Sequence, residues 1–130
     1  MDITDNTRGD FRKLTLVGQF WRREDMDSLE QHVSTCITTG RPWVILDLER
    51  LSFINSQALG MFVRLHNRCG EAGGKLILYQ PRSSVRDVIE IAGFPQFIAI
   101  ADTVEELDAQ MVVCQSGLSP KPENGIPTEP

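Results

Sequence analysis

The stretch WVILDLERLSFINSQALGMFV, residues 43–63, passes from a buried strand through a polar step into a helix. Its first part, residues 43–48, is a short run of β-forming residues between Pro42 and a charged turn, which is typical of a strand covered on both faces. Asn55 and Ser56 then precede a segment of helical period. Two interpretations are open: the polar step only caps the helix, or it also presents Ser56 to a partner.

Strands and helices alternate along the rest of the chain. Alternating or continuous apolar residues predict strands over residues 13–20, 75–79 and 96–101. Apolar residues at helical spacing, with glycine or capping residues at the ends, predict helices over residues 26–37, 57–70, 84–92 and 104–111. Because a helical crossover joins strands that run in the same direction, this order indicates an α/β fold with a largely parallel or mixed sheet.

The composition indicates one globular domain followed by a tail. The chain has 130 residues, of which 41% are hydrophobic and 24% charged, as in ordinary globular proteins. We expect the domain to cover residues 1–114. Residues 115–130 contain four prolines, two glycines and almost no large apolar residues, so burial could not offset the entropy of ordering them. We therefore predict a disordered C-terminal tail.

The charge and the reactive residues argue against several classes of function. A net charge of −5 disfavours general nucleic-acid binding, which needs a basic face. The three cysteines are widely spaced without a metal-binding or disulfide pattern, and the two histidines lie on different predicted helices. The segment GEAGGK, residues 70–75, lacks the hydroxyl residue of a phosphate loop and runs from helix into strand. We expect no catalysis, no metal and no bound cofactor.

No part of the sequence predicts membrane insertion or export. The first ten residues are polar, and no stretch approaches the roughly 18 to 20 apolar residues of a membrane span. We therefore expect a cytoplasmic protein whose partners are other proteins. The oligomeric state stays open between a monomer and a weak dimer.

The helix after Ser56 has an apolar side and a polar side. Ser56 lies where free backbone N–H groups and the positive end of the helix dipole favour a negative charge, so a phosphate would be tolerated there. Gln57, Gly60 and Arg64 line the polar side. Glycine inside a helix costs about 1 kcal/mol relative to alanine. Gly60 therefore indicates either a flat contact patch or close packing against a neighbouring segment.

Residues 44–63, VILDLERLSFINSQALGMFV, resemble the signature of STAS domains, specifically of bacterial anti-sigma factor antagonists. That signature has an apolar strand ending in Asp-Leu, a short turn, a Phe-aliphatic pair and then Asp-Ser-Ser-Gly-Leu-Gly at the start of a helix. The resemblance continues through residues 73–94, GGKLILYQPRSSVRDVIEIAGF, and covers roughly residues 8–113. It implies a STAS fold, a mixed sheet of four to five strands with about four helices packed mainly on one face.

Ser56 matches by position the serine that is phosphorylated in this family. The resemblance implies that the unmodified protein binds an anti-sigma factor with serine kinase activity and frees the sigma factor. It also implies that phosphorylation ends the binding and that a serine phosphatase restores it. Asn55 replaces the usual aspartate, Gln57-Ala58 replaces Ser-Gly, and Trp21 replaces the aspartate of a Gly-Glu-Leu-Asp segment. Trp21 is either a partner hot spot or a ring that covers the sheet edge.

The leading hypothesis is therefore a non-enzymatic anti-sigma factor antagonist. Ser56 is the predicted phosphorylation site. The predicted partner-binding residues are Asn55, Ser56, Gln57, Gly60, Arg64 and Trp21. The alternative is a STAS scaffold, or the cytoplasmic accessory subunit of a lipid-transport complex, that does not switch and uses Ser56 only as a cap. A small nucleotide-hydrolysing enzyme is a third class.

Overall fold

The structure, a computed structural model, describes residues 1–93 and 98–116, with side chains up to residue 111. In this part of the chain the elements follow in the order β1 (Asp2–Arg8), β2 (Phe11–Phe20), α1 (Arg23–Thr38), β3 (Trp43–Asp47), β4 (Leu51–Ile54), α2 (Ser56–Glu71), β5 (Lys75–Tyr79), α3 (Ser83–Ile91), β6 (Ala99–Ala101) and α4 (Val104–Ser116). Residues 96 and 97 of the last predicted strand, and nearly all of the predicted tail, lie outside the described residues. None of the described helices is long and apolar enough to cross a membrane.

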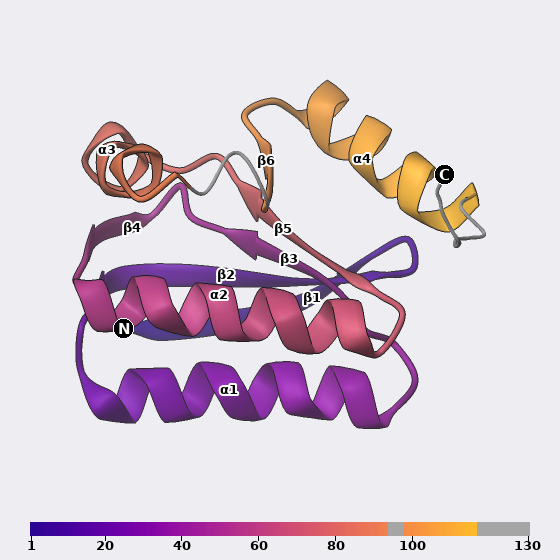
Figure 1. Cartoon of the computed structure of the whole chain (residues 1–130), viewed down its shortest axis with the longest axis horizontal. Coiled ribbons are helices and arrows are strands. Elements are labelled where there is room, and N and C mark those ends of the chain that lie inside the picture. Colours follow the sequence, from indigo (N-terminus) through magenta and orange to yellow (C-terminus); the bar gives the residue numbers. More distant parts are fainter. Residues whose placement is uncertain (94–97, 117–130) are drawn as a thin grey trace.

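The strands form one mixed sheet (Figure 1). The order is β1-β2-β3-β5-β6, and β4 pairs with the C-terminal end of β2. β1 runs antiparallel to β2, whereas the other pairs are parallel. The predicted α/β class and the mixed sheet are therefore confirmed.

The helices are unequally divided between the two faces of the sheet. α1 and α2 lie side by side on one face, and α4 lies on the other side (Figure 1). Val44 and Leu46 of β3 belong to a large core that includes residues of α1, α2 and α3. Ile45 belongs instead to a smaller cluster with Leu107 of α4. Packing mainly on one face is thus confirmed, and β3 is the central strand covered on both faces.

The sheet has six strands where four to five were expected, because the sequence indicated neither β1 nor the four-residue β4. Five of the seven residues of β1 are exposed and only Ile3 and Arg8 are half-buried, so no apolar alternation is visible. The strand instead owes its place to continuous pairing with β2, from Asp2 opposite Val17 to Arg8 opposite Phe11. Its exposure is that expected of a polar edge strand.

The sequence has capping-box spacing at two helix starts, Ser84 with Asp87 and Thr103 with Glu106, and the first of these predictions is wrong. α3 is preceded by Arg82 without a side-chain cap, and the Ser84 hydroxyl instead donates to the carbonyl oxygen of Ser52 at 3.1 Å. This bond ties α3 to β4. At α4 the cap by Thr103 is confirmed, because the backbone N–H of Glu106 donates to Thr103 Oγ1 at 3.1 Å, but the Glu106 carboxylate accepts from the N–H of Asp102 at 2.8 Å and not from that of Thr103.

Candidate functional site

The polar step of the sequence lies at the junction between β4 and α2. Ile54, the last residue of β4, lies opposite Phe20, the last residue of β2. Both side chains are buried in the large core. Asn55 and Ser56 therefore follow the carboxyl ends of two parallel strands, and the packing of these strand ends in the core fixes their position.

Asn55 is the N-cap of α2. Its backbone is extended, and its Oδ1 accepts a hydrogen bond from the backbone N–H of Ala58 at 2.9 Å. Its Nδ2 donates to the carbonyl oxygen of Trp21 at 3.4 Å. One side chain thus satisfies a free N–H at the helix start and joins that start to the end of β2.

Ser56 is the first residue of α2 and is exposed. Its hydroxyl makes no hydrogen bond to any residue that the structure describes. Since Asn55 supplies the cap, Ser56 has no capping role, and this part of the alternative interpretation is wrong. The hydroxyl lies beside the positive end of the helix dipole, where an added phosphate would be electrostatically favoured.

Gln57, Gly60 and Arg64 lie on the same side of α2 and are exposed. Gly60 is one turn after Ser56, because residues four apart are neighbours on a helix surface. A Cβ added at Gly60 would have no described atom within 4 Å. Close packing against any segment that the structure describes, one of the two explanations for this glycine, is therefore excluded.

A groove between α1 and α2 opens beside these residues. It has a volume of about 480 Å³ and is lined by Arg23, Met26, Asp27, Glu30, Gln57, Gly60, Met61 and Arg64. Met26 and Met61 are 8% and 5% exposed. The sequence did not predict the contribution of α1, because the period of each helix sets its apolar side but not which helix lies next to it.

The end of the groove away from Ser56 is crossed by ion pairs. The Glu30 carboxylate lies 3.8 Å from a guanidinium nitrogen of Arg64 and 3.4 Å from one of Arg68. These contacts join α1 to α2. Arg64, predicted to contact a partner, is therefore also part of the link between the helices.

Two exposed aromatic rings lie near the start of α2. Trp21 is 47% exposed and Phe53 is 48% exposed. Phe53 lies opposite Gln19 in the pairing of β4 with β2, one position before the buried pair at the strand ends. The sequence did not single out Phe53, since alternation within a four-residue strand is too short to assign a side chain to one face.

A second cavity of about 470 Å³ lies between α1 and the β1–β2 hairpin. Its wall includes Asp5 and Arg12, whose side chains form a hydrogen-bonded ion pair at 2.6 Å. None of the predicted site residues lines this cavity.

The chemistry of the remaining reactive residues favours a structural role. His32 Nδ1 lies 2.8 Å from the carbonyl oxygen of Ser28 in its own helix. Burial raises the pKa of Cys69 to about 12, so this thiol stays protonated near neutral pH. The backbone N–H of Gly74, in the glycine-rich segment, donates to the carbonyl oxygen of Cys69 at 2.7 Å and helps to close α2. Within the described residues, no group of three or more metal-ligating side chains is found.

Comparison with known proteins assigns the fold to a family. The family model of the STAS domain matches residues 23–107. BtrV of Bordetella bronchiseptica, named an anti-sigma factor antagonist, is 30% identical over 79 residues, 61% of this chain and 68% of BtrV. An anti-sigma factor antagonist from Thermotoga maritima gives a TM-score of 0.75 at 20% identity, over 83% of this chain and 92% of that chain. Unphosphorylated SpoIIAA, also an anti-sigma factor antagonist, gives 0.67 at 22% identity, over 85% and 97%.

The chain therefore belongs to the STAS domain family, as the motif in residues 44–63 implied. Its fold is also that of anti-sigma factor antagonists of known structure.

Proposed function

We propose that this chain is an anti-sigma factor antagonist that switches partners. Unmodified, it binds an anti-sigma factor with serine kinase activity and so frees a sigma factor. Phosphorylation of Ser56 ends that binding, and a serine phosphatase restores it. The observation that carries the proposal is the exposed Ser56 hydroxyl at the first position of α2, held by a cap that it does not itself provide.

Two comparisons support this proposal. BtrV, which is 30% identical over the matched region, is named an anti-sigma factor antagonist. SpoIIAA, whose fold this chain shares, has been solved in phosphorylated as well as unphosphorylated form. The Ser56 site of this chain meets the physical requirements of such a modification, since the hydroxyl is exposed and the helix start favours negative charge.

The contact surface of this proposal surrounds Ser56. It comprises the exposed side of α2 with Gln57, Gly60 and Arg64, the cap Asn55, and the ring of Trp21. A phosphate adds roughly −1.5 to −2 charges without breaking the cap, so the fold survives while an apolar or acidic partner surface is repelled. ATP belongs to the kinase partner, and this chain acts in the cytoplasm as a binding protein, not as an enzyme.

The proposal is tested first on the protein purified from its own cells. Intact mass measurement followed by site mapping is expected to find a fraction carrying a single phosphate at Ser56. The wild-type chain is then used to isolate and identify its anti-sigma factor, which is purified for titration. Ser56→Glu is expected to weaken that complex by roughly 1 to 3 kcal/mol, whereas Ser56→Ala retains binding and accepts no phosphate.

Asn67→Glu is the matched control, because it places the same charge at an exposed position of α2 about three turns away. It should leave the affinity unchanged. If both Ser56 variants bind like the wild type and no phosphate is found at Ser56, the switch is refuted. A scaffold or transporter subunit that binds constitutively is then the better description.

A further inference from the structure

We infer that the groove between α1 and α2 receives an apolar side chain of the partner, whose backbone passes over Gly60. This inference rests on the proposed function, because it takes the occupant to be the anti-sigma factor that binds beside Ser56. It goes further by naming the steric feature that admits this partner and the chemistry of the group that enters.

The free protein does not require glycine at position 60. Its backbone is helical without a positive φ, and an added Cβ would have no described atom within 4 Å. Alanine would fit there and would favour the helix more strongly than glycine does. No described residue fills this space, and we take it to serve another molecule, since close approach of a second backbone is the known use of such a glycine.

The groove has an apolar floor and a charged rim. Its buried residues are Met26 and Met61, whose flexible thioether side chains adapt to the shape of an apolar ligand. The charges on the rim balance, since Arg23 and Arg64 are matched by Asp27 and Glu30. Because the rim carries no net charge, a charged group that reached the methionine floor would lose its hydration without net electrostatic attraction, so an aliphatic or aromatic side chain is the fitting occupant.

The direction of entry follows from the two ends of the groove. Glu30 bridges α1 and α2 through Arg64 and Arg68 at one end. The other end, at Gln57, lies next to Ser56. A phosphate on Ser56 would stand at this open end, one turn from Gly60, and would raise the cost of bringing an apolar group past it. The groove thereby links the proposed modification to loss of the partner.

The test compares Gly60→Ala with Gly70→Ala. Both glycines are exposed within α2, and a Cβ at either one has no described atom within 4 Å. Both substitutions should therefore raise the midpoint of thermal unfolding by about 2 to 8 °C. Only Gly60→Ala should weaken binding to the purified anti-sigma factor, by about tenfold, because its methyl group fills the clearance above the groove. Gly70→Ala should bind like the wild type.

Amide hydrogen exchange in the complex locates the contact independently of these variants. The inference expects slower exchange over residues 23–30 and 57–64 when the anti-sigma factor is bound. The inference is overturned if Gly60→Ala stabilises the protein and binds normally, or if Gly60→Ala does not stabilise the protein. It is also overturned if the exchange rates of both segments are the same with and without the anti-sigma factor. Should Ser56→Glu still weaken binding as expected in any of these cases, the proposed function stands and only the use of the groove is refuted.

Discussion

Asn55 makes two contacts that the family's usual aspartate could not make together. The amide accepts from the N–H of Ala58 and donates to the carbonyl oxygen of Trp21, whereas an ionised carboxylate can only accept. The substitution therefore keeps the cap, gives up a negative charge at the helix start and gains a link to the end of β2. Ser56 is not needed as the cap, because its neighbour accepts the hydrogen bond from Ala58.

Replacement of Asn55 separates these contributions. Asn55→Ala removes the acceptor for Ala58 and should lower the free energy of unfolding by about 1 kcal/mol. Asn55→Asp keeps the acceptor and gains roughly 0.3 to 1 kcal/mol from the helix dipole, which offsets the lost bond to Trp21, so its stability should stay near that of the wild type. Urea unfolding followed by circular dichroism measures both variants. Equal losses would show that the bond to Trp21, and not the cap, stabilises the junction.

At this scale, the residues that helical spacing identified are those that depend on one helix alone. The period of α2 places Gln57, Gly60 and Arg64 together, and the structure confirms that they share an exposed side. Met26 and Phe53 were not identified, because their place beside these residues depends on how separate elements pack and pair.

At the scale of the elements, the turn from α2 into β5 has a packing role that its glycine-rich sequence did not indicate. Gly73 has a φ of +88°, and the next residue, Gly74, lies against Pro42 at the start of β3. The N–H of Lys75 donates to the carbonyl oxygen of Pro42 at 3.0 Å. The two glycines thus bring two loops together before the parallel strands β3 and β5 pair, which is a structural use and not phosphate binding.

Gly74→Ala tests this close approach. A Cβ at Gly74 would overlap the carbonyl oxygen of Pro42, which belongs to the backbone and cannot easily move. The variant should lose about 1 to 3 kcal/mol of stability, with the expected direction opposite to that of Gly70→Ala in the adjacent helix. Thermal and urea unfolding of the two variants provide the comparison. A stable Gly74→Ala protein would mean that the loops separate without cost.

The elements that the sequence predicted are those with strong apolar periods. β3 and β5 are continuous apolar strands, and α1, α2 and α3 bury apolar residues at the expected spacing, whereas α4 buries Leu107 and Met111 but leaves Val104 exposed. β1 escaped prediction because its pairing with β2, and not its own pattern, places it in the sheet. The hydrogen bond of Ser84 was not predicted, because its hydroxyl can bond either within its own helix or to the carbonyl oxygen of Ser52, and tertiary packing decides between them.

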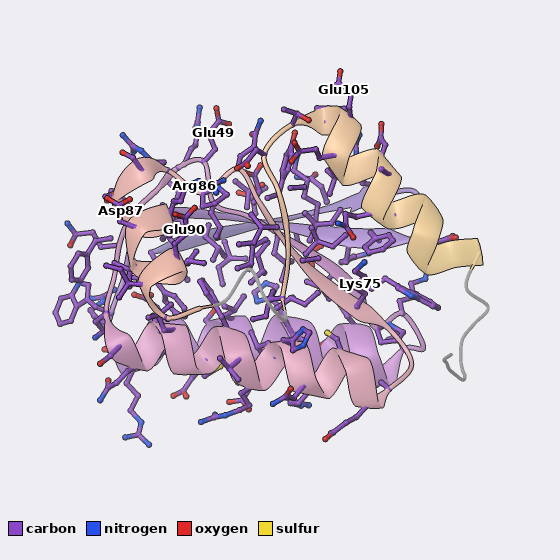
Figure 2. The ribbon with its side chains drawn as sticks, turned by 45° about the horizontal axis from the view of Figure 1, so that its top comes forward. Glu49, Lys75, Arg86, Asp87, Glu90 and Glu105 are labelled. Carbon is purple, nitrogen blue, oxygen red and sulfur yellow. The ribbon has the colours of Figure 1, made fainter. Side chains whose placement is uncertain are left out.

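In the whole molecule, the sheet separates two cores of unequal size. The site belongs to the large core, through Phe20, Ile54 and Phe62. Phe20 and Phe62 have ring centroids 5.7 Å apart, so the end of β2 packs directly on α2 below Ser56. The charged surface of α3 lies outside this packing: Figure 2 shows Arg86 and Glu90 on this helix, and the side chains form an ion pair at 3.1 Å.

The smaller core provides a way to weaken the fold without touching the site. Leu107 of α4 is buried against β3, β5 and β6, on the face opposite α1 and α2. Leu107→Ala should lower the free energy of unfolding by about 2 to 5 kcal/mol, because it removes buried methyl groups and leaves a cavity. Affinity for the anti-sigma factor should remain that of the wild type at temperatures where the variant is folded.

By contrast, Leu65→Ala in α2 removes the same group from the core beneath the site, so there an affinity loss accompanies the stability loss. Unfolding curves together with titrations at one low temperature distinguish the two variants, and an equal affinity loss in Leu107→Ala would mean that the partner also contacts or depends on α4.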